Sequence, residues 1–299
     1  MRTVNCLLAG AMLLFVSFQA IGKDSSDAAE KDALGTLTAS PMLLGAHRCG
    51  RGEWPENTLL AVTEASRRWP DILLEVDAQL SADGHVVLIH DFDVDRTTNG
   101  SGYVGGKTLE ELRALDAAWH FSPDDGKSYP YRGAGVVIPT LDEALAAAPN
   151  HRFMIEMKDG IEIGKAVADV ILKAGASDRC ILASLSPAYL EEFHQHAPEA
   201  ATSFDLLSAA DMLAALRGGT WESYTPVHRV LALSPELQER FALTAEEFSR
   251  MREKGILISM FTLNKPEEMR QAIDNGVDNI LTDRPSVLAK LLEDKQGEH

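Results

Sequence analysis

Residues 74–98 read L-E-V-D-A-Q-L-S-A-D-G-H-V-V-L-I-H-D-F-D-V-D-R-T-T, and the rest of the chain is organised around this stretch. Its first half is an apolar run that carries Glu75 and Asp77 two positions apart. Alternate residues of a strand point to the same face, so both carboxylates are expected on one surface. Two carboxylates that converge in an apolar segment require a cation beside them.

The second half of the stretch returns as a second strand. Asp83 and Gly84 are typical of a two-residue type I′ hairpin turn. That turn would pair position 77 with position 90, which predicts that His90 lies directly across from Asp77 on the same face. A carboxylate pair beside an imidazole is a candidate reactive centre. The alternative is an amphipathic hairpin with a polar outer face.

Outward from the hairpin, the pattern predicts eight strands, each followed by a helix or by a long loop and a helix. The predicted strands are residues 41–47, 71–78, 152–156, 180–184, 201–204, 230–233, 256–263 and 277–282. Eight successive strand–helix units are the pattern of a (β/α)8 TIM barrel, which is an α/β fold. A doubly wound open sheet is the alternative, but no glycine-rich phosphate turn follows the first strand. Residues 92–139 lack sustained apolar periodicity and are predicted to be a small insertion after the second strand.

The chain begins with features of a secretory signal peptide, which we assign to residues 1–22: a basic start, an apolar run and small residues before a polar stretch. The apolar run is shorter than the about 20 residues that span a bilayer. Residues 23–40 are polar and predicted to be a flexible leader, which leaves 41–299 as the folded domain. We therefore expect a periplasmic or secreted protein with no stable membrane insertion after signal removal.

The charge of the chain argues against two classes of binding partner. The net charge is −17, with 45 acidic and 28 basic residues, and no basic cluster occurs. Nucleic acid and anionic membrane surfaces are therefore poor candidates for partners.

One of the three cysteines lies in the predicted signal peptide, and Cys49 and Cys180 belong to opposite ends of the predicted barrel. We expect both to be free thiols.

Polar residues stand at the ends of several predicted strands, where barrel enzymes carry their chemistry. They are His47, Arg48, Glu75, Asp77, His90, Glu156, Lys158, Asn264 and Asp283. A single polar residue at a strand end only marks where the chain leaves the core, so the set carries the argument. Three of these residues, Glu75, Asp77 and Glu156, form an all-oxygen site suited to one divalent cation, Mg²⁺ or Ca²⁺. No cysteine is among these ligands, which argues against a closed structural zinc site.

The remaining strand-end residues suit acid–base work and anion binding. His47 and His90 can act as general base and general acid and exchange these roles between steps. Arg48 and Lys158 supply positive charge for an anion, and arginine suits bidentate contact with phosphate. Metal, cations and two imidazoles together point to phosphoryl transfer or phosphodiester cleavage.

The chain resembles the glycerophosphodiester phosphodiesterases over nearly its whole predicted mature length. The resemblance is carried, in the right order, by His47-Arg48, Pro55-Glu-Asn-Thr58, Glu75-x-Asp77, Asp83-Gly84, Val86-Val87-x-x-His90-Asp91, Arg96-Thr-Thr, Ile138-Pro-Thr-Leu, Ile155-Glu-x-Lys158 and Gly276-Val-Asp-x-Ile-x-Thr-Asp283. It implies a (β/α)8 fold with an insertion and hydrolysis of a small glycerophosphodiester substrate to an alcohol and sn-glycerol 3-phosphate.

The resemblance also implies roles for individual residues. His47 and His90 would be the acid–base pair, Arg48 and Lys158 would hold the phosphate, and the metal ligands would be Glu75, Asp77 and Glu156. In the mechanism proposed for such enzymes, a glycerol hydroxyl attacks phosphorus and water then opens the cyclic phosphate.

The sequence departs from the family pattern at two positions. Cys49 stands where the family has glycine, so a thiol there narrows the site or requires a less unusual backbone angle. Phe261-Thr-Leu-Asn264 stands for Trp-Thr-x-Asn, which keeps an apolar wall and loses the indole donor.

Other functions remain open on the same scaffold. One is a lysophospholipase D-like or cyclic-phosphate-forming lyase reaction, with insertion aromatics (Trp119, Phe121, Tyr129 and Tyr131) lining an apolar mouth or only packing on each other. Another is a catalytically silent barrel that binds a phosphorylated ligand. Retention of both histidines and all three acids argues against the silent barrel.

Overall fold

The computed structural model describes residues 43–160 and 162–297. The predicted signal peptide, 1–22, and the predicted leader, 23–40, lie outside these residues. Within the described part of the chain, every helix is too short or too polar to cross a membrane.

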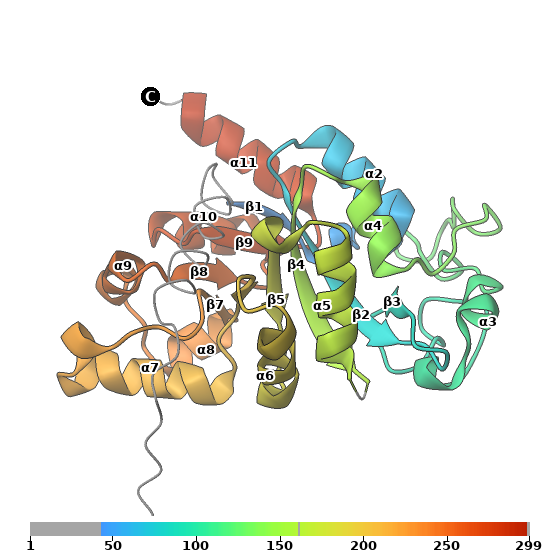
Figure 1. Cartoon of the computed structure of the whole chain (residues 1–299). Helices are drawn as coiled ribbons and strands as arrows, with labels where there is room; N and C mark the ends of the chain where they lie inside the picture. Colours follow the sequence, from blue (N-terminus) through green and yellow to red (C-terminus); the bar gives the residue numbers. More distant parts are fainter. Residues whose placement is uncertain (1–42, 161, 298–299) are drawn as a thin grey trace, which may run out of the picture.

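Eight parallel strands form a nearly closed barrel with helices around its outside (Figure 1). In the sheet, the strands run in the order β6-β5-β4-β2-β1-β9-β8-β7, and a bridge between Ser203 and Val230 joins β6 to β7. The predicted (β/α)8 barrel is confirmed. The strands are β1 (Leu44–Ala46), β2 (Leu73–Leu80), β4 (Arg152–Asp159), β5 (Cys180–Ala183), β6 (Ala201–Thr202), β7 (Val230–Leu233), β8 (Leu257–Met260) and β9 (Asn279–Thr282).

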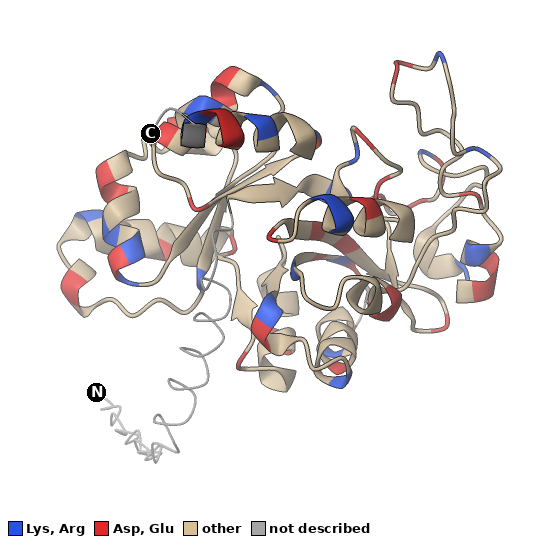
Figure 2. Ribbon diagram, turned by 90° about the horizontal axis from the view of Figure 1, so that it is seen from above, with Lys and Arg blue, Asp and Glu red and all other residues tan. Residues whose placement is uncertain are grey.

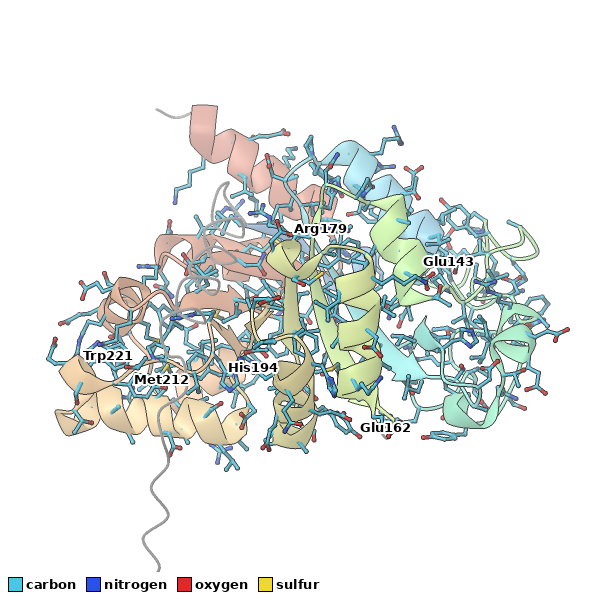
Figure 3. The ribbon with its side chains drawn as sticks, in the orientation of Figure 1. Glu143, Glu162, Arg179, His194, Met212 and Trp221 are labelled. Carbon is cyan, nitrogen blue, oxygen red and sulfur yellow. The ribbon has the colours of Figure 1, made fainter. Side chains whose placement is uncertain are left out.

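The helices follow the strands as the pattern predicted, with one addition, α8, between β7 and α9. Arg179, just before β5, and Glu162, just after β4, mark the two opposite ends of the barrel (Figure 3). The helices are α2 (Leu59–Arg68), α3 (Leu109–Arg113), α4 (Leu141–Ala147), α5 (Ile163–Lys173), α6 (Pro187–His196), α7 (Leu206–Gly218), α8 (Pro235–Arg240), α9 (Ala245–Glu253), α10 (Pro266–Asp274) and α11 (Pro285–Gly297). Short 3-10 helices occur at η1 (His47–Cys49), η2 (Val104–Gly106), η3 (Ser177–Arg179) and η4 (Trp221–Ser223).

The hairpin forms, but its register differs from the prediction. β3 (Val86–Leu88) pairs antiparallel with β2, and Ala78 lies opposite Leu88. The Ser81 amide bonds to the His85 carbonyl, and Gly84 has a φ of 81°, so the loop has three residues instead of two. The predicted pairing of Asp77 with His90 is therefore wrong: the additional loop residue shifts the return strand by one position.

Residues 92–139, between β3 and α4, lie over one side of the barrel beside β2 (Figure 1). The segment has a small apolar core of its own, which includes Val94, Val104 and Leu112 from within it and Val87 from β3. Its return is tied to the hairpin, since the Leu88 amide donates to the Pro139 carbonyl. This matches the insertion that the sequence predicted.

Apolar side chains fill the barrel and the space between barrel and helices. The interior cluster draws one residue from each of six strands: Leu73, Met154, Ile181, Ala201, Val230 and Leu281. Charged residues of both signs are spread over the outer helices (Figure 2). Cys49 and Cys180 are buried and free, as expected.

Candidate active site

Three acids meet on β2 and β4, just beyond the level at which β1 ends. Glu75 and Asp77 lie on β2, and Asp77 pairs in register with Glu156 of β4. One ligand oxygen from each of the three lies within 4.8 Å of the others. The first two are buried, and Glu156 is more exposed. The structure thus brings together the three residues that the sequence analysis named as candidate metal ligands.

The cluster fits a hard divalent cation. All of its donors are carboxylate oxygens, which Mg²⁺ and Ca²⁺ prefer, at metal–oxygen distances of about 2.0–2.6 Å. Asp77 Oδ1 is buried and makes no hydrogen bond in the part of the chain that the structure describes. Burial and the charge of Asp77 raise the pKa of Glu75 well above its usual value. Positive charge is therefore needed to keep all three acids ionised.

Asn57 orients the central acid, a role that the sequence reasoning missed. Its side-chain amide donates to Asp77 Oδ2 at 2.7 Å and accepts from the Asp77 backbone N–H at 3.1 Å. Its φ is 56°, a conformation that asparagine tolerates better than most residues. The next residue, Thr58, caps α2 and accepts a hydrogen bond from the Ala61 amide.

The two predicted phosphate-binding cations lie against this cluster. Lys158 Nζ is 2.7 Å from Glu156 Oε2 and 3.2 Å from Asp77 Oδ1. The Arg48 backbone N–H donates to Glu75 Oε2 at 2.5 Å, and its guanidinium lies 3.5 Å from Asp77 Oδ2. The atom in this contact is Nε, which is buried and makes no hydrogen bond within residues 43–160 and 162–297. Both cations are therefore placed where an anion bound at the cluster would need them.

His47 follows β1 and is held by a carboxylate from β9. Its Nδ1 lies 2.7 Å from Asp283 Oδ1, and Asp283 also contacts Arg51 and Asn264. Burial alone would raise the pKa of Asp283, but the hydrogen bond to His47 and the nearby charges lower it to about 2. An ionised carboxylate on Nδ1 favours the tautomer with its proton there and leaves Nε2 for chemistry.

His90 has the same arrangement on the other side of the site. Its Nδ1 lies 2.7 Å from Asp91 Oδ1, and Arg96 Nε donates to Asp91 Oδ2 at 2.5 Å. Burial opposes ionisation of Asp91, yet the hydrogen bonds from Arg96 and His90 lower its pKa to about 2. Asp91 and Asp283 both lie within the motifs of the family resemblance, but the sequence alone indicated no role for either carboxylate.

Glu56 connects the two sides, and the sequence reasoning did not identify it. Arg48 donates to Glu56 Oε1 at 2.9 Å, and Arg96 donates to both oxygens of Glu56 at 2.7 and 2.8 Å. Burial would raise the pKa of Glu56, but the two guanidinium groups lower it to about 2. A chain of contacts thus runs from His90 through Asp91 and these three residues to the acid cluster.

Cys49 adopts a left-handed backbone conformation. Its φ is 60°, so the predicted alternative of a less unusual angle is wrong. The side chain is fully buried, with Sγ 3.5 Å from the Glu75 carbonyl. Burial, and then the charges of Glu75 and Asp77, raise the pKa of this thiol well above its usual value. The thiol fills space beneath the site.

Comparison with known proteins gives a consistent family. Residues 47–287 match the model of the glycerophosphoryl diester phosphodiesterase family. The glycerophosphodiester phosphodiesterase of Caldanaerobacter subterraneus is 33% identical, over 84% of this chain and 97% of its own length. The enzyme of that name from Bacillus subtilis is 30% identical, over 85% of this chain and 88% of its own length.

Solved structures agree. A glycerophosphodiester phosphodiesterase from Agrobacterium tumefaciens is 26% identical, covers 83% of this chain and 99% of its own, and has a TM-score of 0.65. An Oleispira antarctica phosphodiesterase, in complex with the product sn-glycerol-3-phosphate, has the same fold at a TM-score of 0.67 and 21% identity, covering 86% of this chain and 99% of its own. The chain belongs to the glycerophosphoryl diester phosphodiesterase family.

Proposed function

We propose that this protein is a metal-dependent enzyme that hydrolyses glycerophosphodiesters to an alcohol and sn-glycerol 3-phosphate. The observation that carries the proposal is the pair of imidazoles, each with a carboxylate on Nδ1, beside an acid cluster that fits a divalent cation. The product named for the Oleispira antarctica structure supports the same reaction.

Glu75, Asp77 and Glu156 would hold one Mg²⁺ or Ca²⁺, which supplies positive charge for the oxygens of the phosphodiester. Lys158 and Arg48 border the same cluster and add fixed positive charge to it. Arginine and lysine at this position attract the anionic diester and favour the extra negative charge that develops as its phosphorus is attacked.

His47 and His90 carry the protons. In the first step one imidazole takes the proton from the attacking glycerol hydroxyl, and the other gives a proton to the alcohol oxygen as its bond to phosphorus breaks. A cyclic phosphate and the free alcohol result. In the second step the roles reverse, water opens the ring, and both imidazoles return to their starting state. Asp283 and Asp91 stabilise whichever imidazole is charged.

The insertion aromatics pack on their own segment. Arg132 lies over the rings of Trp119 and Tyr129, at 4.7 and 3.7 Å from their centroids. Phe121 lies against Tyr131 with ring centroids 5.8 Å apart. These contacts favour the simple packing explanation over an apolar mouth for an acyl chain.

The direct test is release of sn-glycerol 3-phosphate from glycerophosphocholine, with and without EDTA. We expect hydrolysis that EDTA removes and that added Mg²⁺ or Ca²⁺ restores. Activity unaffected by chelation would contradict the metal role, and no product from any diester would favour a binding protein. Phosphorus NMR identifies a lyase instead if the cyclic ester persists.

The histidine roles have their own test. We expect His47→Ala and His90→Ala each to abolish turnover while circular dichroism shows a folded barrel. Near-normal rates in either variant would remove that residue from the mechanism.

We also propose export, on the basis of residues 1–22. Expression in a Gram-negative host and sequencing of the mature N-terminus test it. A start near Lys23 in the periplasm or the medium supports export, and a cytoplasmic protein that keeps residue 1 contradicts it.

A further inference from the structure

A polar cavity of about 430 Å³ opens beside the proposed catalytic groups. It lies between the loop after β1, the ends of β8 and β9, and the insertion. Asp283, which holds His47, and Glu56, which holds Arg48, both line it. Its volume is in the range of small-molecule sites in proteins. The other lining residues that carry charge or hold Asp283 are Arg51, Arg96, Asp125, Asn264 and Arg284.

Most charges in this cavity are already paired. Glu56 is bound by Arg48 and Arg96, and Arg96 uses its remaining edge on Asp91. Asp283 accepts from Asn264 and contacts His47. These groups therefore offer little to a ligand.

Arg284 is the exception. It is exposed at the end of β9, and among residues 43–160 and 162–297 its guanidinium makes no ion pair or hydrogen bond. Within the same residues Arg51 makes a single ion pair, through Nε to Asp283 at 3.0 Å, which leaves its terminal nitrogens available. Asp125, from the insertion, is the one acid of the lining without a cationic partner in the same described ranges. Arg51 and Arg284 flank Asp283 on the wall formed by the loop after β1 and the end of β9, so that wall has one positive charge in excess, whereas Asp125 belongs to the insertion.

The two parts of the substrate differ in what they need. Glycerol carries only hydroxyl groups and does not require a free guanidinium. An acyl chain would displace water from the polar lining without replacing its hydrogen bonds, which is unfavourable. An alcohol that carries an anion, by contrast, forms charge-assisted hydrogen bonds with arginine.

We propose that this cavity receives the leaving alcohol, and that Arg284, with Arg51 beside it, selects alcohols that carry an anionic group. The group is a carboxylate or a second phosphate. The inference rests on the proposed function, since it assigns the substrate class of the same site.

Two diesters that differ by one carboxylate provide the test: glycerophosphoserine and glycerophosphoethanolamine. For the wild-type enzyme with metal we expect kcat/KM to be about tenfold higher for glycerophosphoserine, the effect of about 1.4 kcal/mol of differential binding. In Arg284→Ala the ratio falls to about one, and Arg284→Lys keeps part of it because the charge remains. Arg270→Ala on α10, an exposed arginine away from the cavity, keeps the wild-type ratio.

A second pair tests phosphate as the anionic group: bis(glycerophospho)glycerol against glycerophosphoglycerol. A preference in either pair that Arg284→Ala removes supports the proposal and identifies which anion is selected. Equal rates in both wild-type pairs overturn it while the proposed function stands. If Arg284→Ala lowers kcat/KM by the same factor for every diester, the proposal is also overturned. The cavity would then hold the glycerophosphate part, which all of these substrates share. Only failure of every diester to react would remove the proposed function as well.

Discussion

Asp283 contacts more side chains of the site than its position at a strand end suggested. It contacts His47, Arg51 and Asn264 at once, so it fixes the imidazole and the neighbouring loop together. An amide in its place keeps the shape but does not stabilise the imidazolium. We therefore expect the carboxylate to affect catalysis in a way that a purely structural residue would not.

The first prediction follows from that contact. We expect Asp283→Asn to lower kcat by about 100-fold or more, within the usual contribution of acid–base catalysis, and to change the pH profile of kcat. Steady-state kinetics over pH 5 to 9 measure it. Asp274→Asn, an exposed aspartate at the end of α10, is the matched control and should leave both unchanged. A normal profile with only a lowered melting temperature would reduce Asp283 to a structural role.

The second prediction concerns acid stability at Glu56. Its pKa is about 2 in the folded protein and about 4.5 when unfolded, so the unfolded chain binds more protons between these values. Its contribution, on the order of 3 kcal/mol, is therefore complete above pH 4.5 and is lost as the pH falls toward 2. We expect the difference in unfolding free energy between wild type and Glu56→Gln to narrow over this range. Urea titrations at pH 7, 4 and 3 measure it, and a constant difference would contradict the ion pairs.

Single residues of the site differ in how well the sequence alone predicts their positions. Glu75 and Asp77 were predictable because the two-residue period of a strand fixes which side chains share a face. The position of His90 relative to Asp77 was not, since it depends on whether the hairpin loop has two or three residues. Asn57 was missed because its partner Asp77 lies 20 positions away, and Glu56 because Arg96 lies 40 positions away; only the folded barrel brings these pairs together. The other partner of Glu56, Arg48, is 8 positions away, but no local periodicity marks that contact.

At the scale of elements, apolar periodicity located all eight barrel strands and most of the helices. It missed α8, which has six residues and none of them buried, so no apolar stripe marks it. Strand ends also shifted by a few residues, because the sheet pairing and not the local sequence decides where a strand stops.

The third prediction tests helix packing. A methyl group on Gly164 in α5 would lie 2.7 Å from the backbone of Tyr189 and Phe193 in α6, so Gly164→Ala has to push the two helices apart. We expect a loss of about 1–3 kcal/mol in unfolding free energy. Gly218→Ala at the end of α7 meets open space and should be neutral or slightly stabilising. Equal effects of the two substitutions in urea unfolding would show that α5 and α6 are not in close contact.

At the scale of the molecule, the barrel has one weak join. β6 has two residues and meets β7 through a single bridge, whereas β2 and β4 pair along most of their length. Few hydrogen bonds therefore hold the two halves together on that side.

The fourth prediction is that this join opens most readily. In hydrogen exchange followed by mass spectrometry, peptides that contain Phe204 and Arg229, whose amides bond across the join, should exchange faster than peptides from β2 and β4. Equal protection on both sides would mean that the barrel opens only as a whole.

The shared carboxylate of Glu56 has a consequence for engineering. Because it joins the arginine after β1 to Arg96 of the insertion, the insertion cannot be exchanged between family members as an independent module. A graft that lacks an arginine in that position would leave a buried anion half neutralised and would disturb the opposite wall of the barrel mouth. Chimeric enzymes made from this scaffold should therefore take the loop after β1 and the insertion from the same parent.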